Sequence, residues 1–303
     1  MIEPFDRDLV TDYEDFRRRM VSGVRFSRLM FAVMHGNGNV ILVLDEALSG
    51  LRKERVDAVL AREICRSFRA VRVDGIAFVR VTGGRVRMTY FERDGTRSRM
   101  CGNALRCVTR YGMERGYLCA SGDDIVETDD GDKWVSSVRG EVRVALGPDR
   151  EFQRIADGRY FVFSGLPHLV LLVPDLSAVD VVGTGRPLRH DAALCERLRH
   201  PEGLHVDFMQ RLGDGIGVRT YEVGVEDETE ACGTGVAGSA AVAHRVWDLP
   251  YPIRVRVRGG EMTVDQGRHG LMIGGELGYL FATAGRRVTR RGRSPIGMPI
   301  ECS

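Results

Sequence analysis

The sequence predicts an α/β protein made of two related halves. Each half has the same order of segments: strands with alternating apolar residues, a cysteine followed by glycine and a small polar residue, one helix, and further strands. The two cysteines, Cys101 and Cys232, lie 131 positions apart, which is close to half of the 303 residues. A chain of this length can form two domains or two halves of one fold. This spacing suggests an internal duplication whose two copies have diverged too far to show as a simple sequence repeat.

The first half, residues 25–147, is expected to follow a polar extension over residues 1–24 and to be completed by residues 275–303. Its predicted strands are 26–34, 40–45, 75–80 and 86–91. A helix is predicted over 52–68. The glycine-containing turn 93–96 leads to Cys101 and to a helix that ends near Arg115.

The second half, residues 148–274, begins after Gly147-Pro148, a pair typical of a boundary. Its predicted strands are 160–163, 169–173, 206–210, 218–221, 253–257 and 261–264. An acidic loop over 226–230 precedes Cys232, and a helix is predicted over 236–246.

Composition and charge exclude several classes of protein. The hydrophobic content of 43% and the charged content of 28% are ordinary for a globular chain. A net charge of +2 favours neither nucleic acid nor an acidic membrane as a partner. No apolar run approaches the ~20 residues of a membrane span, and no apolar segment of a secretory signal is seen. We therefore expect a cytoplasmic protein, with the arginine-rich segment 286–293 either exposed to solvent or at the edge of a sheet.

The seven cysteines are odd in number, and no pair has the spacing of a zinc ribbon. Neither a disulfide framework nor a metal site is therefore expected, and in a reducing cytosol the thiols would stay free. Cys101 and Cys232 differ from the rest because each precedes a predicted helix. Unpaired N–H groups and the helix dipole at such a position favour the thiolate and bind carboxylates.

Two helix starts that face each other would hold an amino-acid carboxylate between two thiols. One thiol could then remove a proton from one face of a carbon while the other delivers a proton to the opposite face. The ordered motifs that support this hypothesis are Met34-His35-Gly36-Asn37-Gly38-Asn39, Asp94-Gly95-Thr96 before Cys101-Gly102-Asn103, Gly165-Leu166-Pro167-His168, Tyr221-Glu222, and Glu228-Thr229-Glu230-Ala231-Cys232-Gly233-Thr234-Gly235.

In these motifs the chain resembles the diaminopimelate epimerase family of racemases and epimerases over roughly residues 26–280. The resemblance implies two pseudo-symmetric halves, each a curved mixed or antiparallel sheet wrapped around a central helix. It implies that Cys101 and Cys232 are the acid and base, and that His168 and Glu222 assist them. It also implies that no cofactor is needed and that the protein forms a homodimer. The residues implied to bind the substrate are Asn39 and the backbone N–H groups of Gly102, Asn103, Gly233 and Thr234.

The departures from the family pattern lie where it binds the distal end of diaminopimelate. Glu92, Leu166 and His205 replace asparagines, Val223 replaces an arginine and Gly75 a glutamine. A buried distal carboxylate without partners would cost several kcal/mol, so we expect a smaller substrate with a neutral or weakly cationic tail. Glu92 and His205 are the candidates to bind that tail.

Histidine and the O-ureidoserine of cycloserine biosynthesis fit this description. Of the 44 basic residues only Lys53 and Lys133 are not arginine, a bias typical of GC-rich, antibiotic-producing bacteria that favours O-ureidoserine. The open alternatives are diaminopimelate epimerase itself, an isomerase that moves a double bond, and a non-catalytic protein that binds amino acids.

Overall fold

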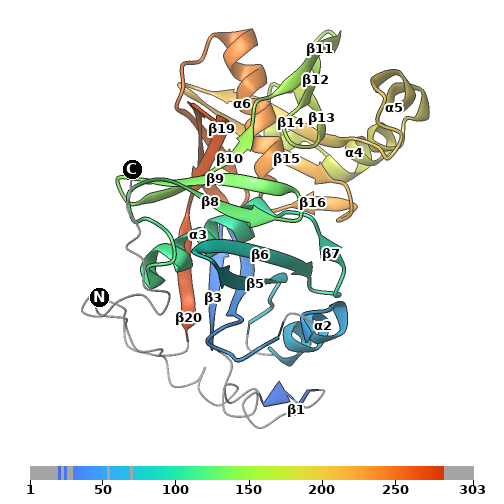
Figure 1. Cartoon of the computed structure of the whole chain (residues 1–303). Coiled ribbons are helices and arrows are strands. Elements are labelled where there is room, and N and C mark those ends of the chain that lie inside the picture. Colours follow the sequence, from blue (N-terminus) through green and yellow to red (C-terminus); the bar gives the residue numbers. More distant parts are fainter. Residues whose placement is uncertain (1–19, 22–23, 26–29, 53–54, 69–70, 283–303) are drawn as a thin grey trace. The chain divides into compact units, whose positions relative to one another are not determined.

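The computed structural model describes residues 20–21, 24–25, 30–52, 55–68 and 71–282 (Figure 1). Most of the predicted extension 1–24 and the segment 286–293 lie outside the described residues. The chain divides into two compact units. The first unit takes the described residues up to Val142 and those from Leu277 to Ala282, and the second unit takes Arg143–Glu276.

In the first unit, strands follow one another with two parallel crossovers. β3 (Met30–Gly36) and β4 (Asn39–Asp45) form a hairpin, and β4 runs parallel to β5 (Gly75–Thr82) after helix α2 (Ala58–Ser67). β5 pairs with β6 (Arg85–Glu92), which is followed by the short β7 (Arg97–Ser98) and helix α3 (Gly102–Arg115). β8 (Gly122–Thr128) then lies parallel to β6 and pairs with β9 (Gly131–Val138), while β20 (Leu277–Ala282) pairs with β3. The two-residue strands β1 (Met20–Val21) and β2 (Val24–Arg25) pair with each other.

The second unit repeats this plan. β12 (Arg159–Phe163) and β13 (Pro167–Leu172) form a hairpin, and β13 runs parallel to β14 (His205–Leu212) after η3 (Leu176–Ala178), α4 (Val181–Arg189) and α5 (Ala192–Leu198). β14 pairs with β15 (Gly215–Glu222), followed by the short β16 (Asp227–Thr229) and helix α6 (Gly233–Trp247). β17 (Ile253–Val257) lies parallel to β15 and pairs with β18 (Gly260–Gly267). β11 (Arg150–Ala156) pairs with β12, and β19 (Gly270–Gly275) pairs with β18 and with β10 (Glu141–Gly147).

The predicted fold class is confirmed: the structure is a mixed α/β fold with mixed sheets and few helices. The central helix of each unit, α3 or α6, contacts several strands of its own unit and is largely buried. Helix α2 starts six residues later than predicted, at Ala58, because Asp57 accepts a hydrogen bond from the N–H of Leu60 and caps the helix there. Helices α4 and α5 were not predicted; Gly183, Gly185 and Pro187 obscure the helical pattern of α4.

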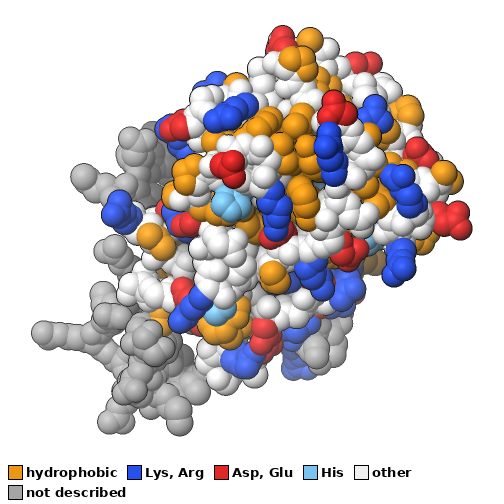
Figure 2. All heavy atoms as spheres, turned by 90° about the horizontal axis from the view of Figure 1, so that it is seen from above, with side chains coloured by type: hydrophobic (Ala, Val, Ile, Leu, Met, Phe, Trp, Pro, Cys, Tyr) orange, Lys and Arg blue, Asp and Glu red, His pale blue; other side chains and the backbone are white. Residues whose placement is uncertain are grey.

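Three further observations bear on the expectations from composition. No helix among the described residues is long and apolar enough to span a membrane. Basic and acidic side chains are interspersed over the face shown in Figure 2, with hydrophobic side chains between them. Among the described residues five cysteines are free, but Cys119 is disulfide-bonded, so the expectation that all thiols stay free is wrong for this residue.

Candidate functional site

Both predicted cysteines lie at the start of the central helix of their unit. Cys101 is the N-cap of α3 and Cys232 is the N-cap of α6, each with extended backbone angles. The backbone carbonyl of each accepts the first helical hydrogen bond, from Leu105 at 2.8 Å and from Val236 at 2.9 Å. Neither side chain makes a capping hydrogen bond to its helix. A thiol in this position lies in the positive field of the helix N-terminus, which favours its thiolate.

A chain of hydrogen bonds runs from the thiol of Cys232 into the core of the second unit. Sγ of Cys232 lies 3.4 Å from Oγ1 of Thr234, and this oxygen lies 3.0 Å from Nε2 of His168. Nδ1 of His168 lies 2.7 Å from Oδ2 of Asp207, whose other oxygen accepts from Thr220 at 2.6 Å. All five residues are buried, and His168 and Asp207 are fully so. The thiol is therefore connected to an imidazole and a carboxylate that solvent does not reach.

The donor and acceptor roles in this chain follow from the carboxylate at its end. An ionised carboxylate only accepts, so Asp207 fixes the proton of neutral His168 on Nδ1 and leaves Nε2 as an acceptor. Thr234 then donates to Nε2 and can accept from the thiol of Cys232. The arrangement can therefore carry a proton from the thiol through the Thr234 hydroxyl to the imidazole, where Asp207 stabilises the resulting imidazolium.

The glycine after Thr234 makes this chain sterically possible. A Cβ atom at Gly235 would clash with the carboxylate of Asp207 and approach the hydroxyl of Thr220. Glycine in the first turn of α6 thus lets a buried carboxylate approach the helix N-terminus, where its charge is favoured.

The surroundings of Cys232 keep its thiol protonated. Burial raises the pKa of Cys232 well above its ordinary value, and the negative charges of Glu222 and Asp207 raise it further. Glu222, at the end of β15, is therefore close enough to act on the thiol electrostatically. In the free protein the thiol of Cys232 is thus protonated, and its deprotonation would require an acceptor such as His168.

His205 lies beside this chain on the neighbouring strand. Its ring stacks on His168 with 4.8 Å between centroids, and its Nδ1 accepts from the N–H of Val223 at 3.3 Å. Burial, followed by the proximity of His168 and Arg189, lowers the pKa of His205 to about 2. His205 is therefore neutral, and its proton lies on Nε2, which makes that nitrogen a fixed hydrogen-bond donor.

Ligand atoms of His168, His205 and Cys232 lie within 4.8 Å of one another, a spacing that can hold a metal ion. The hydrogen bonds argue against coordination, because both nitrogens of His168 have partners and Nε2 of His205 carries a proton. The three side chains fit a hydrogen-bonded site better than a coordination sphere.

In the first unit, polar side chains gather around the turn between β3 and β4. Nη2 of the fully buried Arg106 donates to the amide oxygens of Asn37 at 2.8 Å and of Asn103 at 2.7 Å. Asn37 and Gly38 both have positive φ angles, as the tight turn requires. Oδ1 of Asn39, at the end of this turn, is buried and has no hydrogen-bond partner within the described part of the chain. A buried amide oxygen of this kind can accept a hydrogen bond from a ligand or a water molecule.

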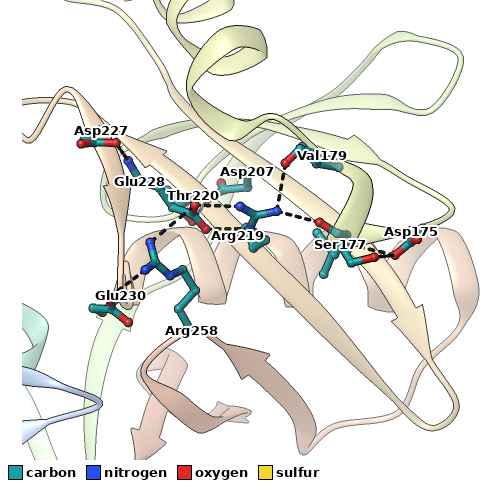
Figure 3. Close-up of polar contacts among 11 residues, drawn as sticks. Asp175, Ser177, Val179, Asp207, Arg219, Thr220, Asp227, Glu228, Glu230 and Arg258 are labelled. Carbon is teal, nitrogen blue, oxygen red and sulfur yellow. Dashed lines mark hydrogen bonds and ion pairs between the residues drawn. The ribbon is translucent and has the colours of Figure 1, made fainter.

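The segment that leads to Cys232 is anchored by ion pairs (Figure 3). The guanidinium of Arg219 on β15 binds the carboxylate of Glu228 on β16 through two hydrogen bonds of 2.6 and 2.8 Å. It also donates to the backbone oxygens of Leu176 and Val179. Arg258 contacts both Glu228 and Glu230, the latter at 3.2 Å. This cluster holds the strand that precedes the thiol against the rest of the second unit.

We expect Arg219→Ala to lower stability by about 1–3 kcal/mol, because it removes a bidentate pair with a half-buried carboxylate. Protease cleavage within 223–231 should become faster. Limited proteolysis and thermal denaturation measure both effects. The exposed pair Arg254–Asp214 gives a matched control, since Arg254→Ala removes a solvated ion pair and should change stability much less. Equal effects of both substitutions would show that the cluster does not anchor this segment.

Comparison with known proteins agrees with this geometry. The family model described as diaminopimelate epimerase matches residues 31–150 and 160–275. The chain belongs to the diaminopimelate epimerase family. A diaminopimelate epimerase of Methanocella arvoryzae is 31% identical over 258 residues, which cover 78% of this chain and 90% of the relative. A diaminopimelate epimerase of Archaeoglobus fulgidus is 33% identical over 260 residues, with coverage of 78% and 89%.

Solved structures share the fold at lower identity. A phenazine biosynthesis protein of the PhzF family from Bacillus anthracis has a TM-score of 0.62 at 15% identity and covers 84% of this chain and 99% of its own. A hydroxyproline epimerase from Agrobacterium vitis has a TM-score of 0.54 at 16% identity, with coverage of 84% and 90%. Membership of the diaminopimelate epimerase family makes this protein an isomerase, a cofactor-independent racemase or epimerase.

The structure distributes the predicted epimerase residues over both units. Five of them lie together in the second unit: His168, His205, Glu222, Cys232 and Thr234. In the first unit, Tyr90 interacts with both Cys101 and Glu92. Arg106 donates hydrogen bonds to both Asn37 and Asn103. Asp207, Thr220 and Tyr90 were not predicted. A carboxylate within the apolar run of β14, two positions after His205, is the sequence signal that could have indicated Asp207.

Proposed function

We propose that this protein is an amino-acid racemase in which Cys101 and Cys232 act on opposite faces of the α-carbon. The observation that carries the proposal is that each cysteine occupies the N-cap position of a buried helix and that Cys232 is connected through Thr234 to His168 and Asp207. In one direction Cys101 removes the α-proton and Cys232 delivers a proton, and in the other direction the roles exchange. Each such group typically contributes ~10²–10⁴-fold to the rate.

The backbone N–H groups at the two helix starts supply the remaining stabilisation. Those of Gly102, Asn103, Gly233 and Thr234 are proposed to bind the α-carboxylate, which gains enolate character as the proton leaves. Donors directed at developing charge in a site without water are worth more than in solution. Asn39, whose buried amide oxygen has no partner among the described residues, is proposed to bind the same substrate.

The second unit supports a substrate without a second amino-acid head. Val223 stands where the family pattern has an arginine. Arg189, whose charge acts on His205, is already engaged: it donates to the carboxylate of Glu226 at 2.9 Å and to the carbonyl of Glu202 at 2.8 Å. His205 itself is neutral. A distal carboxylate at this place would meet no uncommitted cation among these residues, so a neutral tail such as the ureido group of O-ureidoserine fits better.

Incorporation of solvent deuterium at Cα tests both the reaction and the substrate. We expect exchange and loss of optical activity with O-ureidoserine or another amino acid that has a neutral or weakly cationic tail. Histidine and diaminopimelate are the comparison substrates. Exchange with diaminopimelate alone would contradict the substrate proposal, and no exchange with any amino acid would favour a binding protein. Sedimentation of the same preparation tests the proposed homodimer.

The double substitution His205→Asn, Val223→Arg restores two of the family's polar residues. We expect it to raise kcat/KM for diaminopimelate relative to the native substrate by at least about tenfold, because the new guanidinium can bind a distal carboxylate. The measured quantity is the ratio of the two kcat/KM values, which is insensitive to a general loss of activity. The single substitution Val223→Leu is the control and should leave the ratio unchanged. An unchanged ratio in the double variant would place the tail elsewhere.

A further inference from the structure

Tyr90 is a buried tyrosine whose hydroxyl group contacts the thiol of Cys101. It lies on β6, two positions before Glu92, so both side chains project from the same face of the sheet. On this face Gly75 of β5 is paired with Glu92, and Ser98 of β7 is paired with Tyr90. A Cβ atom at Gly75 would clash with the Tyr90 hydroxyl. The absence of a side chain at residue 75 thus provides the space that the phenol occupies.

The hydroxyl of Tyr90 connects a thiol with a carboxylic acid. It donates to Oε2 of Glu92 at 3.2 Å and is also hydrogen-bonded to the side chain of Cys101. The other oxygen of Glu92, Oε1, accepts from Ser98 at 2.8 Å. Both carboxylate oxygens therefore have partners within the first unit. This arrangement favours a role of Glu92 toward Cys101 over a contact with the substrate tail.

Burial sets the protonation of both groups. It raises the pKa of Tyr90 well above its ordinary value, and the charges of Cys101 and Glu92 raise it further. It also raises the pKa of Glu92, although the hydrogen bonds from Ser98 and Tyr90 partly oppose this. Tyr90 therefore stays a phenol, while Glu92 takes up a proton more readily than an exposed glutamate.

We propose that Tyr90 and Glu92 form a proton relay for Cys101. In one form the thiol of Cys101 donates to the Tyr90 oxygen, and the phenol donates to the Glu92 carboxylate. In the other form the S–H bond has broken, its proton is on the Tyr90 oxygen, and the former phenol proton is on Oε2 of Glu92. The phenol then donates to the thiolate. Two protons each move by one position, the net charge is unchanged and no further reactant is needed.

The relay adds to the proposed function and depends on it, because it can assist catalysis only if Cys101 acts on a substrate. It provides Cys101 with a thiolate form without exchange with bulk water, as His168 and Thr234 are proposed to do for Cys232. The two thiols would thus have chemically different partners, a phenol with a carboxylic acid in one unit and an imidazole with a carboxylate in the other.

The rate at which iodoacetamide alkylates Cys101, followed by mass spectrometry across pH, tests the relay without any substrate. Tyr90→Phe removes the donor to the thiolate, so the midpoint of the pH profile should rise by about one pH unit. Glu92→Gln should shift it downward, because Ser98 donates to one side-chain position and would hold the amide oxygen there. The amide NH₂ then faces the Tyr90 oxygen and donates to it, which leaves the phenol proton directed at the thiolate. Opposite shifts are not expected from structural damage alone.

Tyr111→Phe is the matched control. It removes another buried phenol of the first unit, one that lies 3.3 Å from a carboxylate oxygen of Asp45, and should leave the midpoint unchanged. Shifts of Tyr90→Phe and Glu92→Gln in the same direction, or no shift in either, would overturn the relay. If the opposite shifts appear and no amino acid shows exchange, the relay stands and the proposed racemase activity fails. Where a substrate is found, Tyr90→Phe should lower kcat about tenfold and change KM little.

Discussion

Replacement of Cys232 by serine should reduce racemisation roughly 10²–10⁴-fold. The thiol is the group proposed to protonate one face of the α-carbon, and a serine hydroxyl at the same N-cap has a far higher pKa and cannot exchange the proton. Its buried place beside Thr234 suits a hydroxyl sterically, so the fold should be retained. Polarimetry measures inversion, and deuterium incorporation at Cα measures proton exchange.

The two readouts separate the thiols. If Cys101 still removes a proton, the Cys232→Ser variant should exchange the α-proton of one enantiomer with solvent. That amino acid should then be released with its configuration unchanged. Cys101→Ser should show the same behaviour with the opposite enantiomer. Cys195→Ser is the control, because this cysteine is buried in the second unit, where its Sγ donates to the carbonyl of Arg189 at 3.7 Å. Full inversion by either N-cap variant would refute the two-thiol mechanism.

The second large effect is expected for Asp207→Asn, with a loss of about 10³-fold in kcat and little change in KM. Thr220 would hold the amide oxygen, because it donates at this place. The amide NH₂ would then face Nδ1 of His168 and force the ring proton onto Nε2. In that tautomer His168 cannot accept from Thr234, and the connection to Cys232 is broken.

Asp45→Asn is the matched control for Asp207→Asn. Asp45 is also buried, and its Oδ2 accepts from the hydroxyl of Tyr117 at 2.9 Å in the first unit. Its neutralisation should lower the melting temperature and leave kcat unchanged. If Asp207→Asn lowers only the melting temperature as well, the carboxylate stabilises the fold and does not orient His168.

Much of the fold could be predicted because the strands carry strong apolar patterns and the glycines mark their ends. β4 and β14 read as strands from their sequence alone, and each Cys-Gly pair indicated the start of a central helix. α4 could not be predicted in the same way, because two glycines and a proline lower its intrinsic helix propensity and packing against β14 and β15 decides its conformation.

The polar partners of the thiols could be predicted only in part. His168 follows from its motif, but its pairing with Asp207 depends on the parallel register in which His168 of β13 lies opposite His205 of β14. Tyr90 reaches Cys101 only because residue 75 has no side chain, a fact that becomes meaningful once β5 and β6 are paired. Contacts of this kind depend on strand register, and the order of residues along one strand does not reveal them.

The different partners of Cys101 and Cys232 have a kinetic consequence. In the proposed racemase reaction the two mirror-image amino acids have equal free energy, so the ratio kcat/KM must be the same for the L and the D enantiomer whatever surrounds each sulfur. The phenol near one sulfur and the imidazole near the other can therefore make kcat and KM differ between the two enantiomers only by the same factor. The enantiomer that is turned over faster must then also saturate the enzyme at higher concentration.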